Sequence, residues 1–108
     1  MIAAKDLKIR FENDPLSYRW GNIASDLLRI ASIASSASYD AKSFENVLTE
    51  VKLFTEWLSP NLDLQDQKTV ILLQRKLSEW SFKAVSKNSV AIDAKKWSRK
   101  ILALSKWV

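Results

Sequence analysis

The sequence contains neither histidine nor cysteine, and it has one glycine and two prolines among its 108 residues. Without histidine and cysteine, the chain lacks the usual general base at neutral pH, the thiolate nucleophile and most ligands of structural zinc. One glycine cannot make a glycine-rich phosphate loop or a dinucleotide-binding fingerprint. These absences exclude most classes of enzyme, and we expect no catalytic residue, no metal and no cofactor.

The shortage of glycine also disfavours a β-rich fold, because tight hairpin turns depend on residues that accept positive φ angles. The longest unbroken apolar runs, such as residues 70–73, are four residues long. A helix needs roughly 20 apolar residues to cross a bilayer, so we expect no membrane association. The absence of cysteine fits a reducing compartment, and we expect a cytoplasmic protein.

Apolar residues recur at spacings of three and four along most of the chain, as on the core-facing side of amphipathic helices. The four stripes are Leu16, Trp20, Ile23, Leu27, Ile30, Ala34 and Ala37; Phe44, Val47, Val51, Phe54 and Leu58; Val70, Leu73, Leu77, Trp80 and Ala84; and Val90, Ala94, Trp97, Ile101, Leu104 and Val108. Short polar stretches separate them, so successive helices must turn back on one another.

The stripes predict helices at about 15–38, 43–58, 63–86 and 89–107. The expected fold class is all-α, an antiparallel up-and-down four-helix bundle that occupies residues 1–108 as a single domain. Residues 1–13 are ambiguous, because Leu7, Ile9 and Phe11 alternate as in a strand while Leu7 and Phe11 share a helix face. We expect a short helix or arm lying on the bundle, with pairing to a partner's sheet edge as the alternative.

The acidic residues give no sign of a carboxylate pair or a magnesium site. Five acids of the predicted helices fall outside the apolar stripes: Asp26, Glu45, Glu50, Glu56 and Glu79. Acidic side chains are rarely buried without a partner, so we expect each of them to point to solvent or to a helix flank.

The chain has five tryptophans, a high number for its length. Trp20, Trp80 and Trp97 lie in the stripes, where a large ring most simply fills the core. Trp57 and Trp107 each stand one position before a stripe residue. They either seal the gap between neighbouring helices or belong to a contact surface, where tryptophan is favoured.

The sequence carries more apolar residues than four stripes need. Those off the stripes include Leu28, Ile33, Leu53, Ile71, Leu72, Phe82, Ile92 and Leu102. Phe82 lies nearly opposite the core face of its helix, and Ile71 and Val85 lie on a related flank. A sizeable exposed apolar patch usually marks an interface, covered here by the N-terminal segment or by a second subunit. The candidate protein interface is Ile71, Phe82, Val85, Trp57 and Trp107.

The net charge of +5 is unevenly distributed. Residues 1–66 carry 7 Lys and Arg against 10 Asp and Glu, a net of −3, whereas residues 67–108 carry 10 against 2, a net of +8. The last helix presents a candidate anion or nucleic-acid face: Lys95, Lys96, Arg99 and Lys100. Such a face can neutralise phosphates. The alternative is a solvated face complemented by the acids of the helix at 43–58.

Three stretches resemble a group of small uncharacterised helical proteins found in cyanobacteria: DLLRIASIA (26–34), FTEWLSP (54–60) and LQRKLSEW (73–80). The likeness lies in the helix pattern and the placement of tryptophan, and it covers most of the chain. It implies a short helical bundle with no assigned activity, and it carries over no functional residue.

We therefore expect a non-enzymatic helical interaction or adaptor protein that binds a protein partner, or a second copy as a homodimer, through its off-stripe apolar residues. The alternative is an accessory nucleic-acid-binding protein that uses the basic face of the last helix. An enzyme or small-ligand carrier with a pocket between helices is a third hypothesis, less supported than the other two.

Overall fold

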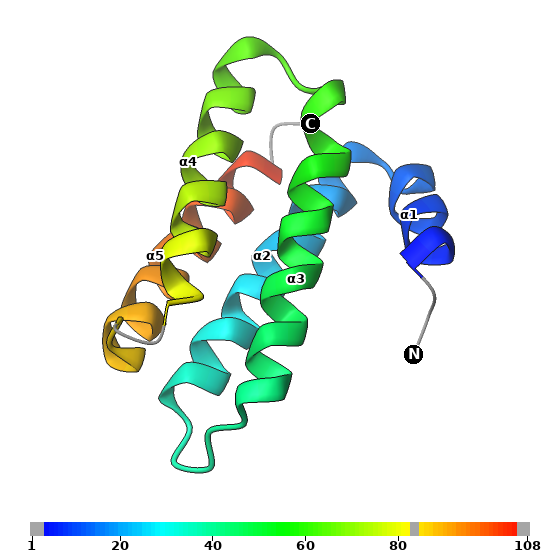
Figure 1. The fold of residues 1–108 in the computed structure, drawn as a ribbon. Coiled ribbons are helices and arrows are strands. Elements are labelled where there is room, and N and C mark those ends of the chain that lie inside the picture. The colour runs from blue at the N-terminus through cyan, green and yellow to red at the C-terminus, as the bar shows by residue number, and fades with distance from the viewer. Residues whose placement is uncertain (1–3, 83–84, 106–108) are drawn as a thin grey trace.

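The computed structural model describes residues 4–82 and 85–105, which form helices and no strand. The helices are α1 (Ala4–Asn13), α2 (Leu16–Ser35), α3 (Ala41–Leu58), α4 (Leu64–Trp80) and α5 (Lys87–Ser105), with a 3-10 turn, η1 (Ser59–Asn61), after α3. The all-α prediction is confirmed. In Figure 1, α2, α3, α4 and α5 lie together, and the shorter α1 lies to one side of them.

Two helices end earlier than their apolar stripes indicate. Helix α2 ends at Ser35, so Ala37 lies outside it and is exposed. Helix α4 ends at Trp80 rather than at residue 86, leaving Phe82 in the connection that follows. Its last turn closes with short-range bonds, in which the Phe82 amide donates to the Glu79 carbonyl at 3.1 Å. Such tighter bonds commonly end a helix.

Two aspartates fix the starts of α3 and α4. The Asp40 carboxylate accepts a hydrogen bond from the Lys42 amide at 3.1 Å, and Asp63 accepts one from the Asp66 amide at 2.9 Å. Each bond satisfies a backbone N–H that has no partner within the first turn of a helix. These capping bonds therefore mark where the connections end and α3 and α4 begin.

The core is formed mainly by the predicted stripe residues. The largest fully buried side chains are Trp20, Trp80, Phe11, Ile23, Leu27, Ile30, Leu58, Leu73, Leu77, Ile101, Val51 and Val70. Eleven of these twelve lie in the four stripes, and Phe11 is the exception. Over the residues described, no helix combines the length and the apolar character that a membrane crossing requires.

Helices α2 and α5 form the most extensive helix pair of the fold. Small side chains lie between them, including the buried Ala24 and Ala31 of α2 and Ala94 and Ser98 of α5. The Ser98 hydroxyl donates to the backbone carbonyl of Ala24 at 2.8 Å. Because the side chains at a helix contact set the distance between the two axes, these small residues permit a close approach. We call this contact the α2–α5 seam.

A larger residue in the α2–α5 seam should separate the two helices. Replacing Ala94, which is fully buried, with leucine should lower the free energy of unfolding by about 1–3 kcal/mol, because overpacking forces backbone shifts. The matched control is Ala103→Leu, on the exposed side of the same helix. Urea unfolding of both variants checks the prediction, and equal stabilities would contradict it.

The ambiguous N-terminal segment is a helix packed on α3. Phe11 is 2% exposed, and its ring stacks on that of Phe54 with centroids 4.4 Å apart and an interplanar angle of 8°. The Trp57 ring lies 6.1 Å from Phe11 and 6.0 Å from Phe54. Three aromatic rings therefore attach α1 to α3, and the position of α1 shapes the cleft described below.

Candidate functional site

All four cations of the predicted basic face are exposed on α5. The Lys100 ammonium lies 4.9 Å from the centroid of the half-buried Trp97 ring, within range of a cation–π interaction. Across residues 4–82 and 85–105, none of Lys95, Lys96, Arg99 and Lys100 forms an ion pair. In the described part of the chain, the acids of α3 therefore make no ion pair with this face.

The five predicted interface residues occupy different environments. Ile71 and Phe82 are exposed, at 47% and 63% of their surface. Trp57 and Val85 are half-buried and pack against the core, so less of their surface is available to a partner. Trp107 lies outside the described residues.

Exposed apolar and cationic residues alternate along the outer faces of α4 and α5. On α4, Lys68, Leu72 and Arg75 follow one another at spacings of four and three, which places them on one helix face. The same holds for Ile92, Lys96 and Arg99 on α5. We call the whole set the α4–α5 surface: Lys68, Ile71, Leu72, Arg75, Ile92, Lys95, Lys96, Arg99 and Lys100.

An ion pair joins the two helices that carry this surface. The Lys76 ammonium lies 3.3 Å from a Glu79 carboxylate oxygen on α4 and 3.9 Å from an Asp93 carboxylate oxygen on α5. Lys76 and Asp93 are half-buried, and in Figure 1 α4 and α5 are neighbours. The α4–α5 surface therefore spans two adjacent helices.

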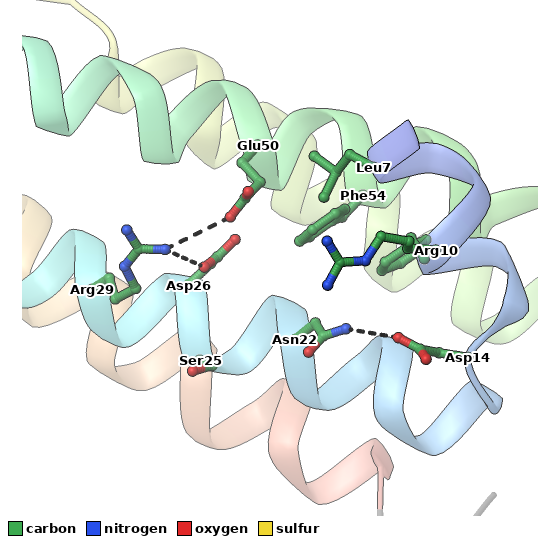
Figure 2. Close-up of a pocket in the computed structure, with 10 residues that line it drawn as sticks. Leu7, Arg10, Asp14, Asn22, Ser25, Asp26, Arg29, Glu50 and Phe54 are labelled. Atoms are coloured by element: carbon green, nitrogen blue, oxygen red, sulfur yellow. Dashed lines mark hydrogen bonds and ion pairs between the residues drawn. The ribbon is translucent and has the colours of Figure 1, made fainter. Parts of the chain in front are cut away.

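A second candidate site lies in a cleft among α1, α2 and α3, with a volume of about 280 Å³. Leu7, Phe11 and Phe54 supply its apolar lining, and Asp26 and Glu50 supply carboxylates. Figure 2 shows the Asp26 and Glu50 side chains extending toward each other from α2 and α3. We call this the acidic cleft.

Of the two environments predicted for Asp26, solvent is wrong: the side chain lies on a flank of α2 and is buried there. Asp26 is 5% exposed, because α2 packs against α5 on one side and against α3 on another. Arg29, one turn further along α2, donates to Asp26 Oδ1 at 3.1 Å, and its Nη1 lies 3.8 Å from Glu50 Oε2. Asp26 Oδ2 is buried, and when Asp26 is ionised this oxygen accepts no hydrogen bond from the described residues.

Burial raises the pKa of Asp26 to about 8, because removal from water disfavours the charged carboxylate. Glu50 adds to the rise, both by accepting a hydrogen bond from protonated Asp26 and by its own charge, whereas Arg29 opposes it. Asp26 is therefore mainly protonated at neutral pH. Two ionised carboxylates can only accept hydrogen bonds. The proton on Asp26 allows it to donate one to Glu50.

Two further charged side chains border the acidic cleft. Arg10 extends from α1 toward the space between α2 and α3, as Figure 2 shows. Asp14, in the connection between α1 and α2, accepts a hydrogen bond from the Asn22 amide at 3.5 Å. The cleft is thus lined by acids, two arginines and an apolar floor.

The sequence contains a weak sign of this site. Asp26 and Arg29 are three residues apart, a spacing at which opposite charges on a helix interact. Such pairs are usually exposed, so the spacing alone does not predict burial. Glu50 lies 24 positions further along the chain, and only the packing of α3 on α2 brings it to Arg29.

Comparison with known protein families, curated proteins and solved structures finds no match to this chain. The likeness to small helical proteins of cyanobacteria stays a prediction.

Proposed function

We propose that this chain is a non-enzymatic interaction protein whose α4–α5 surface binds an acidic, partly apolar segment of another protein. One observation carries the proposal: large apolar side chains stand exposed among cations that have no ion-pair partner in the described residues. Ile71 and Leu72 are each 47% exposed and Ile92 is 58% exposed. Such a surface complements a partner that presents carboxylates around apolar anchors.

The charge of the α4–α5 surface argues against a second copy as its occupant. Two copies joined through this surface would place lysines and arginines against each other, and like charges at an interface oppose association. The exposed leucine and isoleucines favour a protein over a nucleic acid, because phosphate contacts do not require them. Nucleic-acid binding and homodimerisation remain the outcomes against which we test the proposal.

We further propose that α2, α3, α4 and α5 form an antiparallel, up-and-down four-helix bundle to which α1 is added. Short connections and a shared core support this topology. In such a bundle the outer faces of α4 and α5 belong to a rigid scaffold. A partner then meets a preformed surface, which lowers the entropic cost of binding.

The test uses a labelled helical peptide with a leucine stripe flanked by glutamates, and measures its binding by fluorescence anisotropy. The double variant Lys96→Glu, Arg99→Glu should weaken binding by at least about tenfold, because attraction becomes repulsion. Leu72→Ser with Ile92→Ser should also weaken it, by about tenfold, because the apolar anchors are lost. Both pairs are exposed, so the fold should persist.

The matched controls lie on α1, away from the α4–α5 surface. Lys5→Glu with Lys8→Glu changes the net charge equally, and Ile9→Ser removes an exposed apolar side chain. Both should bind the peptide like the unaltered protein. Tighter binding of an oligonucleotide than of the peptide would favour the nucleic-acid function instead. A dimer in light scattering that the charge reversal strengthens would assign the surface to a second copy.

A further inference from the structure

We infer that a pocket beside Gly21 binds a neutral molecule with several hydroxyl groups, such as a monosaccharide. The pocket has a volume of about 470 Å³ and lies where the start of α2 meets the end of α5. We call it the Gly21 pocket, and it is lined by Asp14, Ser17, Tyr18, Gly21, Asn22 and Ser105. None of these residues belongs to the α4–α5 surface, so the inference is independent of the proposed function.

The first observation is that no packing in the described part of the chain requires a glycine at position 21. Gly21 lies inside α2 and does not have a positive φ angle. A Cβ atom at this position would have no atom within 4 Å beyond the adjacent residues and the backbone of its own helix. Glycine is disfavoured in a helix interior, so alanine would suit the fold better. What glycine provides here is an open floor, where a ligand can approach the backbone closely.

The second observation is an aromatic wall beside this floor. Tyr18 precedes Gly21 by three residues, which places the two on neighbouring turns of one helix side. Its side chain lines the pocket and is 65% exposed. The face of an aromatic ring carries partial negative charge and attracts the C–H groups on the face of a sugar ring. An exposed tyrosine over an open floor therefore suits a sugar.

The third observation is a set of polar groups that a ligand can reach. The Asn22 amide donates to the Asp14 carboxylate across a long contact of 3.5 Å, and Figure 2 shows the two side chains extending toward each other. Asn22 is exposed and Asp14 is half-buried. Among the side-chain hydrogen bonds of the described residues, none uses the hydroxyl of Ser17 or of Tyr18. The pocket thus offers donors and acceptors side by side, which matches adjacent hydroxyls that each donate and accept.

The charge and size of the pocket favour a small neutral ligand. Asp14 is the one charged residue of the lining, so an anion is repelled. Arg19 donates through its Nε to the Asp14 carbonyl at 3.0 Å, and its nearby positive charge weakens the attraction for a cation. Ligand pockets commonly have volumes of about 300–1,000 Å³, and the Gly21 pocket lies in the lower part of this range.

The experiment follows the Gly21 backbone amide by ¹H–¹⁵N NMR during titration with glucose and with maltose. The chain has one glycine, so this signal reports from the pocket itself. Both sugars should shift the signal with millimolar affinity. Cyclohexanol and glucose 6-phosphate should bind at least about tenfold more weakly, because the first lacks adjacent hydroxyls and the second is repelled by Asp14.

Gly21→Leu should weaken glucose binding by at least about tenfold, measured at the Tyr18 amide, because the new side chain fills the floor of the pocket. It should also raise the unfolding temperature, since leucine is a better helix former than glycine. Loss of binding is thereby separated from loss of the fold. Tyr18→Ala should weaken binding by about fivefold through loss of the aromatic wall.

The matched controls lie on the same helix, outside the pocket. Ser32→Leu adds a leucine at an exposed position, and Leu28→Ala removes an exposed side chain. Both variants should bind glucose like the unaltered protein. The inference is overturned if neither sugar shifts the Gly21 signal at tens of millimolar, if cyclohexanol or glucose 6-phosphate binds as tightly as glucose, or if Gly21→Leu binds glucose normally. A Gly21 signal that shifts with protein concentration alone would also overturn it, by assigning the pocket to a second copy.

Discussion

Replacing Asp26 with asparagine should stabilise the protein at pH 8 by an amount on the order of 2–4 kcal/mol. In the unfolded chain Asp26 ionises near its ordinary pKa of 3.8, whereas in the folded protein burial keeps it protonated up to about pH 8. Between these values the folded state binds the extra proton. The unaltered protein therefore loses stability as the pH rises from about 4 to about 8, and the loss is complete above pH 8.

Asparagine has nearly the shape of protonated aspartic acid and does not ionise, and its amide can donate to Glu50. The stability difference between the variant and the unaltered protein should thus grow by up to about 1.4 kcal/mol per pH unit. Urea unfolding at pH 5, 6, 7 and 8 measures this slope, with Glu56→Gln as the control for an exposed acid. Parallel curves for the unaltered protein and Asp26→Asn would show that Asp26 is ionised in the folded state.

Replacing Phe11 with alanine should lower the free energy of unfolding by about 3–5 kcal/mol, the usual cost of removing a buried phenylalanine. The substitution removes the ring stacked on Phe54 and leaves a cavity beside Trp57. Because these rings attach α1 to α3, the amides of Ala4–Asn13 should exchange with solvent faster than in the unaltered protein.

The matched control is Ile9→Ala on the same helix, where the side chain is 49% exposed. It should change the stability by less than about 0.5 kcal/mol, as surface substitutions usually do. Equal losses for the two variants would mean that helix propensity, rather than the aromatic contact, determines the stability of α1. Unchanged amide exchange in the Phe11 variant would argue against this attachment.

Hydrophobic spacing predicts the all-α fold class because each stripe marks a helix face that must be removed from water. Trp20, Leu27, Leu73 and Ile101 are all predicted as core residues, and all are buried. Spacing works at these positions because a large apolar side chain has one favourable environment. Helix ends are less predictable, as α4 shows by ending at Trp80 through backbone bonds that the stripe does not encode.

The burial of Asp26 could not be predicted because it depends on how many neighbours a helix has. A stripe of threes and fours describes a helix with one buried side. Helix α2 has α5 on one flank and α3 on the other, so Ala24 and Asp26 are both buried beside the stripe. The conformation around Phe11 is hard to predict for a related reason. The spacing of its apolar neighbours fits both a helix and a strand, and the choice depends on packing against α3.

The two candidate sites also differ in how far the sequence predicts them. Residues of the α4–α5 surface are exposed because they lie off the stripes, which the sequence alone indicates. The acidic cleft combines residues from three helices, and the raised pKa of Asp26 depends on its burial and on its contact with Glu50. Spacing within one helix does not show which residues of another helix it contacts, so the sequence alone does not predict the cleft.

The α2–α5 seam has a consequence for the order in which the protein folds. The hydrogen bond from Ser98 to Ala24 joins residues 74 positions apart, so the most extensive helix pair closes a long loop. Contacts this distant form slowly, because the chain must lose much conformational freedom before they stabilise it. During synthesis, α2 emerges from the ribosome long before α5. Until α5 is synthesised, the side of α2 that packs against it stays exposed to water, and exposed apolar surface of this kind makes a nascent chain prone to aggregation.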